Sequence, residues 1–222
     1  MQSPTLVREV VGASHGKMAR LKELVDAQPS LSKAAWDWGF GDWESALGAA
    51  SHVGNREIAE YLISKGAVPT IFSATMLGQV EVVKAMVTAS PGIQRISGPH
   101  SISLLDHAKN GGAAAKPVLE FLESLGDAGV PPRPAISIEE MKELVGSYEF
   151  GSGPTERIEI ALAGKGLSFM RKGTDARGLI YKGEQVFHPA GSSAVQVRFV
   201  KSGGGLTLTV HSPELVLTAR KL

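Results

Sequence analysis

The stretch 45-SALGAASHVGNREIAEYLISKGA-67 decides how the first part of the chain folds. In its second half Ile58, Tyr61 and Leu62 lie three and four positions apart, the spacing of one face of a helix. Gly54 separates two such segments, and a glycine can adopt the left-handed conformation of a tight turn between antiparallel helices. The stretch therefore predicts a helix, a turn and a second helix.

The same pattern recurs on both sides of this stretch. Apolar residues with helical spacing surround three further glycines, Gly16, Gly78 and Gly111. Each predicted helix is too short to bury its apolar face alone, so the pairs must stack against one another. We predict about four helix pairs in residues 1–126, forming a solenoid with a left-handed turn at each glycine.

The central stretch resembles the ankyrin repeat. Nine residues fall on the signature positions of that family: Leu47, Ala49, Ala50, Gly54, Glu57, Ile58, Leu62, Gly66 and Ala67. Gly48 stands where the family usually has a histidine. The resemblance covers roughly residues 5–126. It implies a non-catalytic domain that binds a protein partner through its concave face and through the finger loops between repeats.

The periodicity changes after residue 126. Residues 127–137 are rich in Pro and Gly and predict a linker, and Ser137 with Glu140 predicts the capping box of a short helix. From Gly146 onward apolar and polar residues alternate, as in 156-ERIEIAL-162. We predict about eight short strands in residues 138–222, forming a small antiparallel β-barrel. The fold class is α+β, with an all-α part followed by the barrel.

This second part is similar to a lipocalin-like domain at the C-terminus of bacterial serine hydrolases of the beta-lactamase type. The segments that carry the likeness are 145-VGSYEF-150, 158-IEIALAGKGLSFM-170, 186-VFHP-189 and 197-VRFVKSGGGLTLTVH-211. In those proteins the domain is an accessory, which implies a structural or binding role here. An alternative to partner binding is therefore a small apolar ligand inside the barrel, against Phe169, Tyr181, Phe187 and Phe199.

The segment 33-KAAWDWGFGDWE-44 contains all three tryptophans of the chain. In the ankyrin family this is the position of a finger loop, and exposed tryptophans are frequent hot spots of binding. We predict that the loop binds the partner through aromatic anchors and neighbouring carboxylates: Trp36, Trp38, Phe40 and Trp43, with Asp37, Asp42 and Glu44. The alternative is that the tryptophans pack onto the neighbouring helices.

Two histidines, His15 and His52, each lie just before the turn glycine of a repeat and are expected to be neighbours. They could bind a metal ion with Asp37, Asp42 or Glu44 as an oxygen ligand. However, the sequence contains no pair of histidines at the helical spacing typical of metal sites. We therefore favour hydrogen bonds from these histidines to loop carbonyls, and we predict neither a metal nor a cofactor.

The string 12-GASHG-16 matches the nucleophile elbow of serine hydrolases, with Ser14 as the nucleophile. That motif requires a preceding strand, whereas the residues before it have helical spacing. A serine hydrolase is therefore the less favoured function, and we predict that the chain is not an enzyme.

The overall composition excludes further classes. Lys and Arg number 23 and Asp and Glu 22, and this balance is not that of a nucleic-acid-binding protein. No apolar run approaches the roughly 20 residues that span a membrane. Gln2-Ser3-Pro4 has the polar character of the start of a mature exported chain, which favours the periplasm over the cytoplasm.

Overall fold

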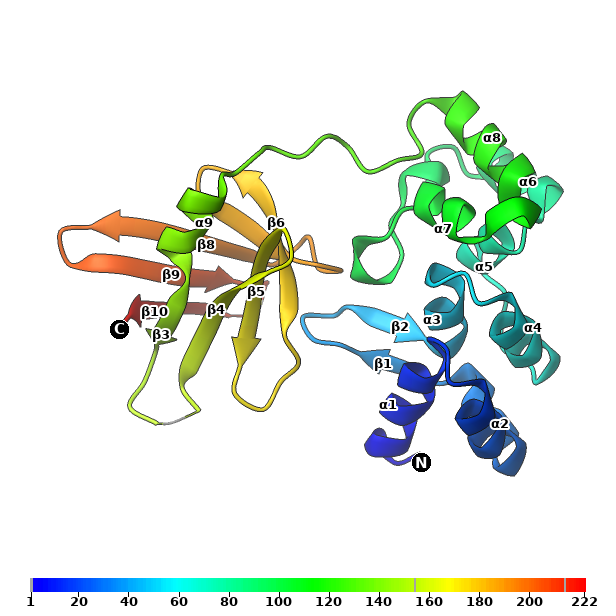
Figure 1. Cartoon of the computed structure of the whole chain (residues 1–222), viewed down its shortest axis with the longest axis horizontal. Coiled ribbons are helices and arrows are strands. Elements are labelled where there is room, and N and C mark those ends of the chain that lie inside the picture. The colour runs from blue at the N-terminus through cyan, green and yellow to red at the C-terminus, as the bar shows by residue number, and fades with distance from the viewer. Residues whose placement is uncertain (1, 154, 214) are drawn as a thin grey trace. The chain divides into compact units, whose positions relative to one another are not determined.

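The computed structural model describes residues 2–153, 155–213 and 215–222. The chain forms two compact units. The first contains the residues up to Asp37 and those from Trp43 to Pro131, and the second contains Trp38–Asp42 and Pro132–Leu222. The protein is therefore an α+β chain with a helical region followed by a β-barrel (Figure 1).

Helices make up most of the first unit. Its described residues form the α-helices α1 (Pro4–Ala13), α2 (Met18–Ala27), α3 (Ala46–His52), α4 (Arg56–Ser64), α5 (Ile71–Met76), α6 (Val80–Ala89), α7 (Leu104–Asn110) and α8 (Lys116–Leu125). Short 3-10 turns lie at η1 (Pro29–Lys33), η2 (Ile93–Arg95), η3 (Pro99–Ser101) and η4 (Gly112–Ala115). The first helices of successive pairs contact one another in chain order, α1 with α3, α3 with α5 and α5 with α7. The predicted helical region is confirmed.

The predicted glycine turns are correct at two of four positions. Gly54 and Gly78 have φ angles of 74° and 76°, in the left-handed region. The prediction is wrong for Gly16, which lies outside that region, and for Gly111, whose φ is −69°. At the fourth turn Gly112 is left-handed instead, with φ of 64°, because the 3-10 turn η4 is inserted before α8.

The predicted finger loop folds as a β-hairpin. Strand β1 (Ala35–Asp37) pairs antiparallel with β2 (Trp43–Ser45), and Trp36 lies opposite Glu44. Gly39, Phe40 and Gly41 at its tip all have positive φ angles. Two glycines in three residues make this tight reversal possible, because glycine adopts positive φ without steric cost.

The second unit contains a closed barrel, whose described residues form eight antiparallel strands as predicted. The strands are β3 (Gly146–Glu149), β4 (Arg157–Ala163), β5 (Gly166–Arg171), β6 (Arg177–Gly183), β7 (Val186–Pro189), β8 (Gln196–Ser202), β9 (Gly205–His211) and β10 (Val216–Lys221). Each strand pairs with the next in sequence, and β10 closes the barrel against β3. Closure leaves no exposed sheet edge.

Aromatic side chains fill the barrel interior. Phe199 makes edge-to-face contacts with Tyr148 and Phe187, at centroid distances of 5.7 Å and 5.6 Å. The helix α9 (Ile138–Leu144) begins at the predicted capping box of Ser137 and Glu140. Its C-terminal carbonyl at Leu144 accepts a 2.7 Å hydrogen bond from the buried Tyr148 hydroxyl. This bond fixes α9 to the barrel.

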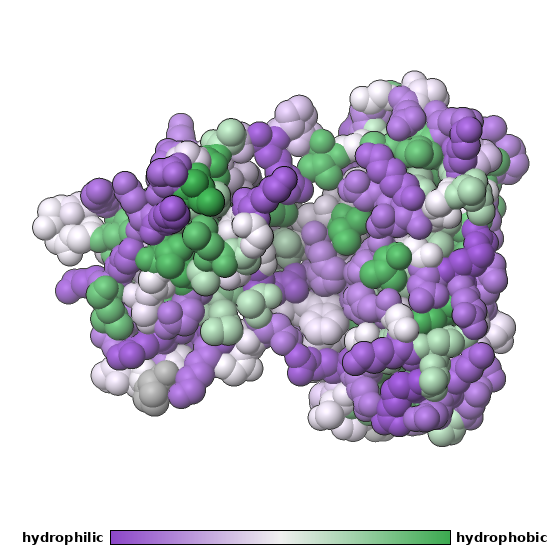
Figure 2. Space-filling view, in the orientation of Figure 1, coloured by the Kyte–Doolittle hydropathy of each residue, from purple (hydrophilic) through white to green (hydrophobic). Residues whose placement is uncertain are grey.

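Figure 2 shows that the visible face of each part is mostly hydrophilic, with small hydrophobic patches between polar groups. No α-helix in the described part of the chain has the length and apolar character needed to cross a membrane.

The alternation along β4 generates a test of the barrel core. Ile158 is fully buried, whereas Leu162, on the same face of the same strand, is 41% exposed because it lies beyond the core. We expect Ile158→Ala to lower the free energy of unfolding of the barrel by about 3 kcal/mol through the cavity it leaves. Leu162→Ala is the matched control and should cost about 0.5 kcal/mol. Urea unfolding followed by circular dichroism measures the free energy of unfolding of both variants. Equal losses in the two variants would contradict the placement of Ile158 inside the core and of Leu162 beyond it.

Candidate metal centre

Four side chains from separate segments of the helical region meet at one point. His15 follows α1, Glu44 lies on β2, His52 ends α3, and His100 lies in the 3-10 turn η3. Each residue offers one nitrogen or oxygen atom, and these atoms all lie within 4.8 Å of one another. We refer to these four residues as the His–Glu cluster.

Glu44 is the centre of the cluster. Its side chain is fully buried, and its carboxylate uses both oxygens. Oε1 lies 3.0 Å from Nδ1 of His52 and 3.4 Å from Nε2 of His100, and Oε2 lies 3.5 Å from Nε2 of His15. Burial raises the pKa of Glu44, but the imidazoles of His100 and His52 outweigh burial and lower it to about 2. The carboxylate is therefore negatively charged at neutral pH.

The orientation of His15 is set by the backbone of α1. Its Nδ1 lies 3.1 Å from the carbonyl oxygen of Val11 and 3.2 Å from that of Gly12. Both partners are acceptors only, so Nδ1 must carry the proton. In the neutral ring Nε2 then has its lone pair directed toward Glu44, which is the arrangement of a metal-binding histidine.

The ring of His52 packs between the other two imidazoles. Its centroid lies 5.0 Å from that of His15 and 5.3 Å from that of His100. Among the described residues its buried Nδ1 finds no partner with hydrogen-bond geometry, although Glu44 Oε1 is close. The backbone of His52 is fixed by Asn110, whose side-chain amide donates a 2.6 Å hydrogen bond to the carbonyl oxygen of His52.

His100 is held in place by a strained loop. His100 and Ser101 have φ angles of 59° and 61°, in the left-handed region that residues with a side chain rarely adopt. Two interactions close the loop: the isolated β-bridge between Ser97 and Ser103, and a 2.8 Å hydrogen bond from the Gly98 N–H to the carbonyl oxygen of Ile102. Strain of this kind tends to occur at functional sites.

Gly48 lies next to Glu44 and to the loop that carries His100. A side chain at this position would contact Ser45 Oγ at 3.2 Å, and Glu44 and Pro99 at 3.8 Å.

The other residues predicted for binding are distributed along the hairpin. Trp43 is 63% exposed, whereas Trp36, Asp37 and Trp38 are half-buried. The hairpin tip belongs to the second unit. There the Phe40 ring lies 5.5 Å from that of Phe169, and the buried Asp42 forms an ion pair with Arg177.

Sequence reasoning named three of the four cluster residues but favoured hydrogen bonds from the histidines over a metal site. It placed His15 and His52 together and considered Glu44 as an oxygen ligand, while Asp37 and Asp42 lie outside the cluster. The expected hydrogen bonds to carbonyls are present at Nδ1 of His15, whose Nε2 also faces Glu44. His100 was missed, because no local spacing links a loop residue to the earlier repeats.

Ser14, the residue considered as a hydrolase nucleophile, is fully buried. Its hydroxyl donates a 2.8 Å hydrogen bond to the carbonyl of Val10, one helical turn earlier. It follows the helix α1, whereas the elbow motif requires a preceding strand.

Comparison of the chain with protein-family models, with curated proteins and with solved structures finds no match.

The geometry of His15 generates a test that is independent of any metal. We expect Nδ1 of His15 to carry a proton in the metal-free protein, because it faces two carbonyl oxygens. Long-range proton–nitrogen NMR correlation of the histidine rings measures this. A His15 ring with an unprotonated Nδ1 would contradict the orientation described here.

Proposed function

We propose that the helical region binds one divalent transition-metal ion of the zinc class through His15, Glu44, His52 and His100. The observation that carries the proposal is the spacing of the donor atoms. With zinc–nitrogen and zinc–oxygen bonds of about 2.0–2.1 Å, the donors of a tetrahedral site lie roughly 3.3 Å apart. Glu44 Oε1 lies 3.0 Å and 3.4 Å from the nitrogens of His52 and His100, Oε2 lies 3.5 Å from that of His15, and the four donor atoms together lie within 4.8 Å of one another.

Electrostatics support the same proposal. A buried carboxylate needs a positive partner, because the protein interior solvates an isolated charge poorly. The Glu44 pKa of about 2 keeps this carboxylate charged. A divalent cation at the centre of the cluster would neutralise it and would accept the lone pair of His15 Nε2. His52 would bind through Nδ1, whereas His15 and His100 would bind through Nε2.

The donor set also selects the kind of ion. Three imidazoles and one carboxylate suit zinc and its neighbours among the transition metals, whereas magnesium and calcium prefer sets composed of oxygen. Four protein donors complete a tetrahedral shell and leave no position for a substrate. We therefore propose a structural, non-catalytic role, in which the ion joins the end of α1, the hairpin, the end of α3 and the loop of His100.

The proposal is tested by titrating the full chain, after removal of metal by a chelator, with zinc in a calorimeter. We expect one ion per chain, a Kd below about 1 μM and a higher unfolding temperature in the presence of zinc, because the ion binds only the folded state. Glu44→Gln keeps the shape and removes the charge, and should weaken binding at least about tenfold. His100→Gln, in a half-buried loop, should do the same.

The matched control is His211→Gln, since His211 is an exposed histidine of the barrel strand β9. It should leave zinc binding unchanged. The proposal would be overturned if Glu44→Gln and His100→Gln bound zinc as tightly as the native chain does. It would also be overturned if the native chain did not bind zinc at micromolar concentrations.

We also propose, as a second function, that the helical region is an ankyrin-type stack that binds a protein partner. The observation that favours it is the exposure of Trp43, 63% of whose surface is accessible on the hairpin. Large exposed aromatic side chains are typical of binding hot spots. The contacts between successive first helices, from α1 through α3 and α5 to α7, support the stacked arrangement.

This second function predicts where the partner contacts the chain. A photo-crosslinking amino acid at position 43 should form a covalent adduct with one protein in cells of the source organism. The same group at position 82 is the control, since Val82 is also exposed, at 46%, but lies on α6. Adducts at neither position, or the same adducts at both, would contradict a binding role for the hairpin.

A further inference from the structure

A cavity lies at the end of the barrel where β5 and β9 end and β6 and β10 begin, and all of its lining residues belong to the second unit. Its volume is about 280 Å³, and it contains none of the residues of the His–Glu cluster. Its apolar lining includes Trp38, Phe40, Ile158, Phe169, Leu215 and Leu217. Cavities of this kind, mostly apolar and rich in aromatic rings, are typical of small-molecule sites.

The cavity differs from the site that the sequence predicts for an apolar ligand. Of the four aromatic residues named for that site, Phe169 lines this cavity. Phe187 and Phe199 instead contact each other edge to face inside the barrel, at a centroid distance of 5.6 Å. The space for a ligand therefore lies at the end of the barrel, beyond its filled interior.

The segment Trp38–Asp42 forms one wall of the cavity and is held in a single position. The Phe40 ring lies edge to face on that of Phe169, 5.5 Å away, and the Phe40 carbonyl accepts a 2.7 Å hydrogen bond from the buried Ser192 hydroxyl. Asp42 forms a buried ion pair with Arg177. The wall is therefore preformed, as the walls of ligand sites usually are.

This fixed wall leaves space beside the barrel core unfilled. Phe40 has a φ angle of 59°, a left-handed conformation that is strained for a residue with a side chain. Despite this cost its ring does not close the cavity next to the buried Ile158 and Phe169. Unfilled space beside a core is destabilising, and apolar cavities in proteins can bind benzene-like molecules. A ligand that fills the space would recover the lost packing contacts.

The charges around the cavity select an uncharged ligand. Arg177 is already paired with Asp42, and its guanidinium also donates a 2.7 Å hydrogen bond to the carbonyl of Ala190. The other two charged lining residues, Arg171 and Asp175, have opposite signs. The two positive charges are thus balanced by two negative ones, and an ionic ligand would lose its hydration without gaining an excess of opposite charge.

The hydroxyl groups of the lining are engaged within their own turns. Thr174 Oγ1 donates a 2.8 Å hydrogen bond to the carbonyl of Arg171, and Ser212 Oγ donates one of 3.1 Å to the carbonyl of Leu215. Aromatic rings dominate the remaining wall, and they pack favourably against another ring face to face or edge to face.

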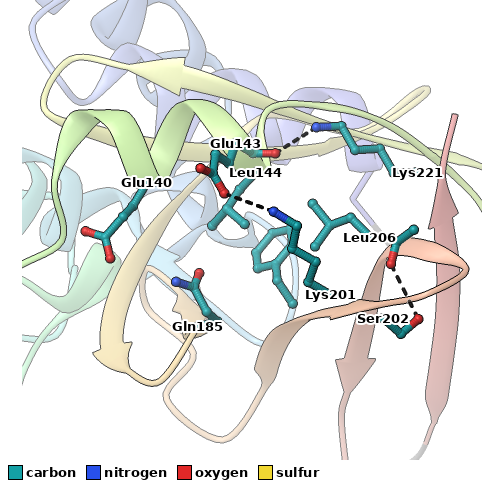
Figure 3. Close-up of a pocket in the computed structure, with 10 residues that line it drawn as sticks. Glu140, Glu143, Leu144, Gln185, Lys201, Ser202, Leu206 and Lys221 are labelled. Atoms are coloured by element: carbon teal, nitrogen blue, oxygen red, sulfur yellow. Dashed lines mark hydrogen bonds and ion pairs between the residues drawn. The ribbon is translucent and has the colours of Figure 1, made fainter.

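A larger cavity of about 520 Å³ has a different character. It lies between α9 and the strands β8, β9 and β10, and Figure 3 shows charged side chains along its rim. Lys201 Nζ lies 3.8 Å from the Glu143 carboxylate, and Lys221 Nζ donates a 2.7 Å hydrogen bond to the Glu143 carbonyl. This rim is less suited to an apolar ring than the aromatic lining of the smaller cavity is.

We infer that the cavity beside Phe40 and Phe169 binds a small uncharged aromatic molecule, of the size of a naphthylamine. The rings of the ligand lie against Trp38, Phe40 and Phe169, and Leu215 covers them from the rim. The strained tip of the hairpin is retained because it holds the Phe40 ring as a wall of this site.

The experiment compares two fluorescent probes that differ by one charged group. N-phenyl-1-naphthylamine is uncharged, and 8-anilino-1-naphthalenesulfonate is the same ring system with a sulfonate. The fluorescence of both rises in apolar surroundings, so each is titrated with the full chain. We expect N-phenyl-1-naphthylamine to bind one per chain and at least about tenfold more tightly than the sulfonate, because the sulfonate must lose its hydration.

The decisive variant is Leu215→Glu, which places a charge at the rim of the cavity. Leu215 is 61% exposed, so the variant should fold and keep the unfolding temperature of the native chain. We expect it to bind N-phenyl-1-naphthylamine at least about tenfold more weakly. Val216→Glu is the matched control, because Val216 is 57% exposed and does not line the cavity. It should bind the probe as the native chain does.

The inference is overturned if N-phenyl-1-naphthylamine does not bind saturably or if the sulfonate binds as tightly. It is also overturned if Leu215→Glu binds the uncharged probe as tightly as the native chain, which would place the probe elsewhere, as in the cavity of Figure 3. Equal weakening by Leu215→Glu and Val216→Glu would have the same meaning. None of these outcomes depends on whether the helical region binds a metal.

Discussion

The buried carboxylate of Glu44 is the constraint on which much of the helical region depends. A negative charge without contact with water is destabilising unless positive or donor groups surround it. The imidazoles of His100 and His52, which come from segments far apart in the sequence, hold the pKa of this carboxyl low. The left-handed conformation of His100 is a local feature of this arrangement.

The same constraint determines what the hairpin presents to solvent. Successive side chains of a strand point to opposite faces. Because Glu44 points inward on β2, its neighbour Trp43 must point outward, and its ring is largely exposed. The proposed metal centre and the proposed binding surface are therefore two faces of one short strand. An ion that fixes Glu44 would also hold the tryptophan in one position.

Local signals predicted the fold well, and long-range contacts explain what sequence reasoning missed. The capping box at Ser137 and the alternation in β4 depend on neighbouring residues, and both were predicted correctly. His100 reaches the cluster from a loop between α6 and α7, so no repeat position reveals it.

The most direct test of the metal centre is X-ray absorption spectroscopy at the zinc edge on the full chain loaded with one equivalent of zinc. The proposal predicts four nitrogen or oxygen neighbours at about 2.0–2.1 Å, with the outer-shell scattering of three imidazole rings. A shell of five or six oxygen-like neighbours, with one imidazole or none, would show that zinc binds elsewhere on the surface. That result would contradict the assignment of His15, Glu44, His52 and His100 as its ligands.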